Sequence, residues 1–155
     1  VALPHFEESS ASFCRTMSSS MSRSERDWVA QGASEADVLS RLYDVWTYKE
    51  ALTKNMGLGL GYDFARIDLR FGRDVRLAMD GRAVDTYRFR ELALPCGASS
   101  HAPGSRVAVA LGPCDAREAP MAKQAVPAQQ AMDEGWLRMW TYDAWLEYAR
   151  AMSGV

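Results

Sequence analysis

The fold is decided by residues 62–94, which read YDFARIDLRFGRDVRLAMDGRAVDTYRFRELAL. Apolar and charged side chains alternate from Phe64 to Phe71, and the alternation resumes after a short turn that contains Gly72. Because successive strand side chains point to opposite faces, this pattern is typical of two half-buried strands. The hairpin that they predict has three facing apolar pairs: Phe71 with Val75, Leu69 with Leu77, and Ile67 with Met79.

The dipeptide Asp80-Gly81 predicts a second, tighter hairpin. Asp-Gly favours a two-residue turn between strands, because both turn positions need a positive φ. We therefore expect a third strand to follow directly. The register pairs Leu77 with Val84, and Arg76 with Asp85 as a cross-strand ion pair.

This register creates a conflict farther along the third strand. It would place Arg88 and Arg90 on the apolar face and turn Tyr87 and Phe89 away from it. One extra residue in a strand reverses the facing of everything after it. We therefore expect a bulge near Asp85 that returns both aromatic side chains to the core.

The remaining chain predicts helices on both sides of this sheet and one more strand. Ser24 and Ser34, each with an acid three residues later, are typical N-terminal caps. The expected elements are helices over 9–23, 24–32, 37–56 and 133–152 and a strand over 106–111. We predict a single α+β domain over residues 1–155, with N-terminal helices, a central antiparallel β-meander of about four strands, and a C-terminal aromatic helix packed on the sheet.

Composition excludes several classes of protein. The chain has 155 residues and a formal net charge of −2, which gives no general attraction to nucleic acid or anionic membranes. No apolar run approaches the roughly 18 residues that span a bilayer, so we expect a soluble or peripheral protein. A disulfide between Cys96 and Cys114 is an even alternative to two reduced thiols, and it would indicate an exported or organellar protein.

Motifs for catalysis or cofactors are weak. Gly57 to Gly61 has a GxGxG pattern, but it lies between a helix and a strand, the reverse of the order in a phosphate-binding loop. No GxSxG motif surrounds any serine, and His101 and His5 have no recognisable partners. A Ser–Lys dyad with Lys49, Lys54 or Lys123 has no support. With two histidines and no CxxC spacing, we predict no metal site, no cofactor and no catalytic residue.

Two sets of residues are candidates for binding. Arg66, Arg70 and Arg76 are expected on the outer sheet face, where they would form a weak anion site. Nearby acids make that region almost neutral, so nucleic acid is an unlikely partner. The C-terminal helix has more apolar surface than one core-facing stripe requires, which indicates a protein partner or self-association. Its predicted contact residues are Trp136, Trp140, Trp145 and Tyr148.

These features favour a non-catalytic interaction or structural protein, a subunit of a larger assembly. A small exported binding, inhibitor or immunity-type protein is the first alternative. The second alternative is a small-molecule-binding or enzymatic pocket between helices and sheet, in which Trp46, Tyr87 and Trp140 would be lining residues. The amino-acid sequence identifies neither the partner nor the compartment.

Overall fold

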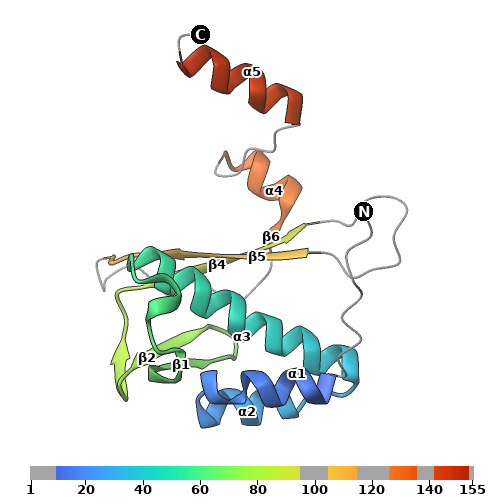
Figure 1. Ribbon diagram of the computed structural model, residues 1–155, viewed down its shortest axis with the longest axis vertical. Coiled ribbons are helices and arrows are strands. Elements are labelled where there is room, and N and C mark those ends of the chain that lie inside the picture. Colours follow the sequence, from blue (N-terminus) through green and yellow to red (C-terminus); the bar gives the residue numbers. More distant parts are fainter. Residues whose placement is uncertain (1–9, 95–104, 115–125, 136–141, 154–155) are drawn as a thin grey trace. The chain divides into compact units, whose positions relative to one another are not determined.

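A computed structural model of the chain describes residues 10–94, 105–114, 126–135 and 142–153. The chain divides into two compact units (Figure 1). The first consists of residues 1–91 and 107–125, and the second of residues 92–106 and 126–155. Each unit is described by itself.

Three helices form the N-terminal half of the first unit. They are α1 (Ser10–Met17), α2 (Arg23–Ala30) and α3 (Glu35–Asn55), with a 3₁₀ turn, η1 (Ser18–Ser20), after α1. Ser34 caps α3 as predicted, since its side chain accepts a hydrogen bond from the Asp37 amide. The predicted cap of α2 is two residues too late. Ser22 is the cap, and it forms a reciprocal capping box with Glu25.

Three short antiparallel strands follow in the order β1-β2-β3. Their bounds are β1 (Ile67–Arg70), β2 (Arg76–Met79) and β3 (Arg82–Val84), preceded by two 3₁₀ turns, η2 (Gly59–Gly61) and η3 (Phe64–Arg66). The predicted register is confirmed, with Leu69 facing Leu77 and Leu77 facing Val84. Asp80 and Gly81 have φ values of +52° and +74°, as their turn requires. The strand begins three residues later than the alternation suggested, because Phe64–Arg66 is helical.

Near Asp85, where a bulge was predicted, the structure instead has a break between two sheets. The first sheet ends at Val84, and β4 (Arg88–Leu94) belongs to a second sheet of order β5-β4-β6. The other members are β5 (Ser105–Leu111) and the short β6 (Val126–Pro127), which runs parallel to β4. The break brings Phe89 into the core, as the bulge was expected to do, but Arg88 is also buried. The predicted ion pair between Arg76 and Asp85 does not form.

The main core lies where α3 packs on β1 and β2. Its buried members are Tyr48, Leu52, Ile67, Leu69, Leu77, Phe89 and Ala110. A second buried cluster, which joins α1, α2 and α3, consists of Met21, Val29, Leu42 and Val45. The prediction that Ile67, Leu69 and Leu77 face inward is therefore confirmed. Through these contacts α3 supports the rest of the first unit.

In the second unit, α4 (Ala128–Asp133) follows β6, and α5 (Tyr142–Ser153) is the last element. The single helix predicted over 133–152 is wrong at its start, because α4 ends at Asp133 and Gly135 has a positive φ of 79°. The α+β fold class is confirmed, although the strands divide between two sheets. Within the described residues, no helix has the length and hydropathy of a membrane span.

Candidate active-site face of helix α3

A buried carboxylate links α2 to β1 and to α3. Glu25 in α2 has no exposed surface. One of its oxygens, Oε1, accepts a hydrogen bond of 2.8 Å from the amide of Leu69, on the edge of β1 that faces away from β2. The other, Oε2, accepts a hydrogen bond of 2.7 Å from the Ser22 amide at the start of α2. Two backbone donors that would otherwise be orphaned in the interior are therefore satisfied.

Lys49 in α3 completes this arrangement. Its ammonium nitrogen lies 2.6 Å from Oε2 of Glu25, and the Lys49 side chain is only 1% exposed. The same nitrogen donates to the carbonyl of Ser20 at 2.9 Å and to the carbonyl of Phe64 at 2.8 Å. The three N–H donors of the ammonium group therefore each have an oxygen acceptor. We call these residues, Glu25 and Lys49 with their backbone partners, the Glu25–Lys49 joint.

Burial opposes the charged form of both side chains in the joint. It raises the pKa of Glu25 and lowers the pKa of Lys49, while the attraction between the two acts in the opposite direction. Asp68 lies beside the joint, where Ser22 and Ser24 donate hydrogen bonds to it. Partial burial alone would raise the pKa of Asp68, but these hydrogen bonds, together with one from Arg70, lower it.

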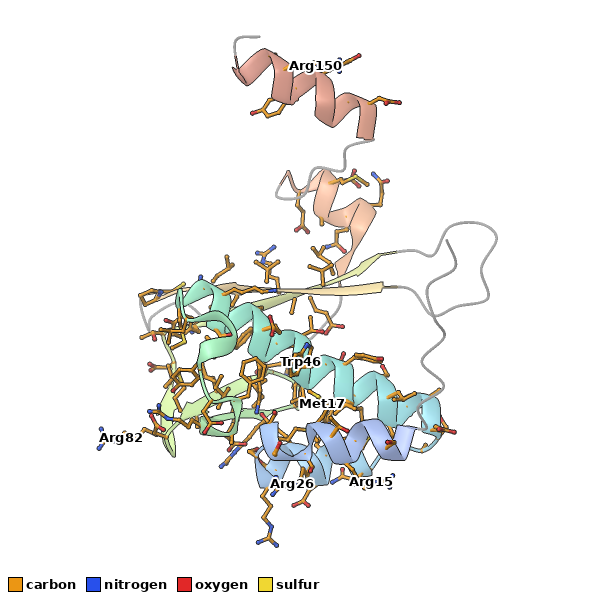
Figure 2. All side chains as sticks on the ribbon, viewed as in Figure 1. Arg15, Met17, Arg26, Trp46, Arg82 and Arg150 are labelled. Atoms are coloured by element: carbon orange, nitrogen blue, oxygen red, sulfur yellow. The ribbon has the colours of Figure 1, made fainter. Side chains whose placement is uncertain are left out.

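Glu50, the residue after Lys49, lies in a different environment. Trp46, Glu50 and Lys54 are spaced by four residues on α3, so they follow one another along one side of the helix. The Glu50 side chain is 15% exposed, and its Oε2 lies 3.1 Å from the ammonium of Lys54, which is 71% exposed. Trp46, labelled in Figure 2, packs its ring 5.1 Å from that of Phe64. We call these three residues the α3 face.

The α3 face combines an exposed base, Lys54, with an acid, Glu50, whose side chain is only partly exposed. By contrast, Lys49 is sequestered and cannot meet a ligand without breaking the joint. Lys54 can contact an anion, and the short side chain of Glu50 can accept a proton or bind a cation. Glu50 was not among the residues predicted to be functional, and Lys54 was considered only as a member of an unsupported Ser–Lys dyad. The signal that could have identified them is an acid and a base at i and i+4 next to a tryptophan.

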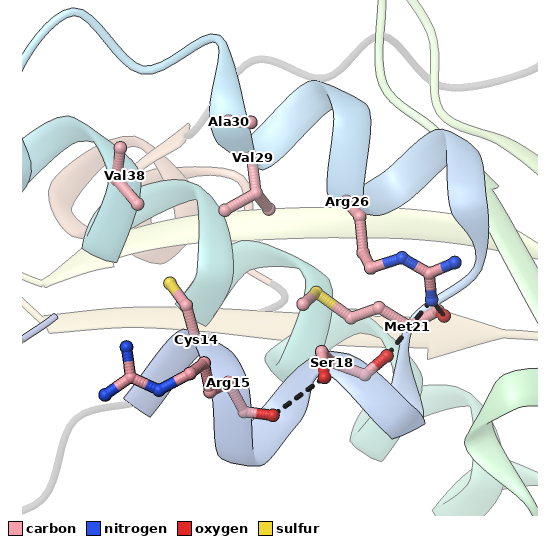
Figure 3. A pocket seen from close by; sticks show the side chains of 8 residues that line it. All are labelled: Cys14, Arg15, Ser18, Met21, Arg26, Val29, Ala30 and Val38. Atoms are coloured by element: carbon pink, nitrogen blue, oxygen red, sulfur yellow. Dashed lines mark hydrogen bonds between the residues drawn. The ribbon is translucent and has the colours of Figure 1, made fainter. Parts of the chain in front are cut away.

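The first unit also has a pocket of about 390 Å³ (Figure 3). Its lining residues come from α1, η1, α2 and α3: Cys14, Arg15, Ser18, Met21, Arg26, Val29, Ala30 and Val38. The lining is mostly apolar. The Arg26 guanidinium donates hydrogen bonds to the carbonyls of Met21 and Ser18, so part of its donor capacity is already used. Because no lining residue is a carboxylate or imidazole, this pocket suits an aliphatic group better than acid–base chemistry.

The structure separates the arginines that were predicted to bind an anion. Arg66 forms a two-pronged ion pair with Asp80, with both nitrogen–oxygen distances at 2.7 Å. That pair lowers the pKa of Asp80. Arg70 donates to Asp68 at 3.2 Å and lies directly opposite Arg76 across the hairpin. Arg76 is exposed and has no ion-pair partner among the described residues. Whether these arginines bind an anion stays a prediction.

The other predicted sites are mostly outside the described residues. Trp136, Trp140, Cys96, His5 and His101 all lie there, as does Lys123. Trp145 is in α5, but its side chain is not described, whereas Tyr148 is 49% exposed. Cys114 is half-buried with a free thiol. The partner-binding role and the disulfide therefore stay predictions. Tyr87 and Trp46 do not line the pocket of Figure 3. Within the described ranges, no group of three or more His, Cys, Asp or Glu side chains could hold a metal ion.

Comparison with known proteins places this geometry in context. A family model described as the 4′-phosphopantetheinyl transferase superfamily matches residues 1–109, which include α1 to α3 and the first sheet. A curated relative, the 4′-phosphopantetheinyl transferase pptA of Paxillus involutus, is 40% identical over 67 residues. The matched stretch is 43% of this chain and 25% of that relative.

These findings correct the functional prediction. A non-catalytic structural protein or assembly subunit is contradicted, because both matches are to enzymes. The enzymatic alternative agrees better with them. The prediction relied on short catalytic motifs, and the sequence has none of those that were considered.

Proposed function

The chain belongs to the 4′-phosphopantetheinyl transferase superfamily. We propose that it acts in the transfer of a 4′-phosphopantetheinyl group to a carrier protein. In this proposal Glu50 and Lys54 contact the reacting groups. The observation that carries this proposal is the family match over residues 1–109. The matched relative bears the name of this activity. The α3 face supplies a partly exposed acid and an exposed base within the matched region.

The chemistry of such a transfer takes place at phosphorus. In a donor such as coenzyme A, the group is joined through a diphosphate to the adenosine part of the molecule. A hydroxyl oxygen of the carrier protein forms the new bond to phosphorus, and the bond from that phosphorus to the bridging diphosphate oxygen breaks. The hydroxyl proton passes to a base, and the adenosine part leaves with the other phosphate. Catalysis of this kind depends on positioning and on neutralising phosphate charge.

Lys54 suits the phosphate role. Its ammonium is a mobile point charge with three donors, and its only ion-pair partner within the described residues is Glu50, four residues earlier. An exposed pair of this type contributes little to stability, so Lys54 can turn to a phosphate at little cost.

Glu50 suits the second role, as a proton acceptor or cation ligand. Its carboxylate is held close to the helix and is largely covered. Mg²⁺ in phosphoryl-transfer sites is usually bound by one or two carboxylates together with substrate phosphates and water. A single carboxylate from this chain is compatible with that arrangement. Bound there, the cation would neutralise phosphate charge.

The test is a transfer assay with the purified chain, coenzyme A and an apo acyl carrier protein, read out by the intact mass of the carrier. Glu50→Gln and Lys54→Ala should each lower the transfer rate by about 10²-fold or more, the usual effect of losing a group that acts in the transition state.

Matched controls are available on α2, where Arg23 and Asp27 form another exposed i, i+4 ion pair. Asp27→Asn and Arg23→Ala should leave the rate within twofold of the unmodified chain. Equal effects in the two pairs would contradict a special role for the α3 face. Binding of coenzyme A, measured by calorimetry, should also weaken in Lys54→Ala and not in Arg23→Ala.

A further inference from the structure

Lys49 and Glu50 are neighbours in sequence, but they belong to different environments. The Lys49 side chain is buried in the joint, and the Glu50 side chain belongs to the α3 face. Successive residues of an α-helix are rotated by about 100°, so whatever fixes Lys49 also fixes the direction of Glu50. The position of the α3 face therefore depends on how firmly Lys49 is held.

Lys49 is held from three directions at once. Glu25 belongs to α2, Ser20 to η1 and Phe64 to η3, and each supplies one oxygen to the ammonium group. Three acceptors on separate elements restrict both rotation of α3 about its axis and sliding along it. Apolar contacts alone are less directional and tolerate small shifts.

Phe64 links the joint to the α3 face directly. Its carbonyl accepts a hydrogen bond from Lys49, and its ring packs against Trp46. Glu50 lies one turn beyond Trp46 on the same side of the helix. A change in the position of the Lys49 side chain should therefore affect both Trp46 and Glu50.

A buried ion pair is in general not required for stability. The desolvation of two charges offsets much of their attraction, and well-packed apolar side chains often stabilise a protein equally well. An ion pair with several defined acceptors differs from an apolar pair chiefly in specifying one geometry.

We propose that Lys49 is a positioning residue for the transferase reaction, and that the Glu25–Lys49 joint sets the orientation of Glu50 on the α3 face. The proposal rests on the proposed function. Lys54 has a long, exposed side chain that can follow the donor if α3 shifts slightly. Glu50 has a shorter side chain close to the helix and cannot compensate in that way. Loosening the joint should therefore affect kcat more than the KM for coenzyme A.

The test compares the double variant Glu25→Leu/Lys49→Met with Leu52→Ala. The double variant replaces the joint with apolar side chains, whereas Leu52 is a fully buried core residue on the same helix whose side chain has no hydrogen-bonding group. Both are assayed at a temperature at which circular dichroism shows them fully folded. We expect kcat to fall at least tenfold in the double variant, with the KM for coenzyme A changed less than threefold. Leu52→Ala should keep kcat within threefold of the unmodified chain.

A second readout requires no substrate. Amide hydrogen exchange over residues 46–55 should rise in the double variant more than in Leu52→Ala. If the unmodified chain transfers the group and the double variant retains its kcat, the positioning role is overturned while the proposed function stands. If the unmodified chain shows no transfer, the proposed function fails, and exchange alone decides whether the joint orders this segment. If the double variant does not fold, Glu25→Gln, which keeps the size and one oxygen of the side chain, replaces it in the same comparison. A kcat within threefold of the unmodified chain in a folded Glu25→Gln would overturn the positioning role.

Discussion

Removing one partner of the Glu25–Lys49 joint should have a larger effect on stability than any exposed ion pair. Glu25→Ala leaves the Lys49 ammonium in the interior without its carboxylate, and it removes the acceptor for the Leu69 and Ser22 amides. Breaking a buried pair in this way costs about 3–5 kcal/mol. That is a large part of the roughly 5–15 kcal/mol that stabilises a typical domain.

A double-mutant cycle separates the interaction energy of Glu25 with Lys49 from the other effects of each substitution on the free energy of unfolding. Lys49→Met should also be destabilising, because it leaves the Glu25 carboxylate buried and unpaired. The double variant Glu25→Leu/Lys49→Met should recover part of the loss, since no unpaired charge then remains. The recovery should be incomplete, because the Leu69 and Ser22 amides still lack their carboxylate acceptor. The two single changes should therefore be strongly non-additive.

The assay is urea unfolding followed by circular dichroism, with the free energy of unfolding extrapolated to water. The exposed pair Arg23–Asp27 provides the control, because changes there should alter stability by less than about 1 kcal/mol. A loss below about 1 kcal/mol in Glu25→Ala would refute the reasoning. So would a double variant that is less stable than both single variants.

Two further predictions concern the hairpin. The hydrogen bonds from Ser22, Ser24 and Arg70 lower the pKa of Asp68, so this carboxylate contributes stability above its unfolded pKa of about 3.8 that is lost as pH falls through the lower folded value. Thermal unfolding of Asp68→Asn between pH 2 and 5 (roughly the range in which Asp titrates) should be less dependent on pH than that of the unmodified chain, and equal slopes would contradict this. Arg76→Glu should raise stability by about 0.2–1 kcal/mol, because Arg76 lies directly opposite Arg70; a lower urea midpoint would contradict the observed register.

Local sequence patterns predicted the hairpins well. Alternation and the Asp80-Gly81 turn depend on residues that are close in sequence, so the facing pairs of β1, β2 and β3 could be derived without knowledge of the remaining chain. The second sheet was harder to predict. A bulge and a break between sheets both restore Phe89 to the core, and only contacts with distant strands decide between them.

The candidate functional residues could not be recognised in the same way. Burial of Lys49 depends on Glu25, on Ser20 and on Phe64, which are separated from it by between 15 and 29 residues. From the sequence, Lys49, Glu50 and Lys54 are three similar charged residues on one helix. Tertiary contacts divide them into a buried joint and an accessible face.

The most direct test of the account is the transfer rate of Glu50→Gln per folded molecule, measured with coenzyme A and an apo acyl carrier protein. We predict a rate about 10²-fold or more below that of the unmodified chain. The midpoint of unfolding should change little, because Gln has nearly the size of Glu and the ion-pair partner that it loses, Lys54, is 71% exposed. A rate within threefold of the unmodified chain would show that the α3 face takes no part in the reaction.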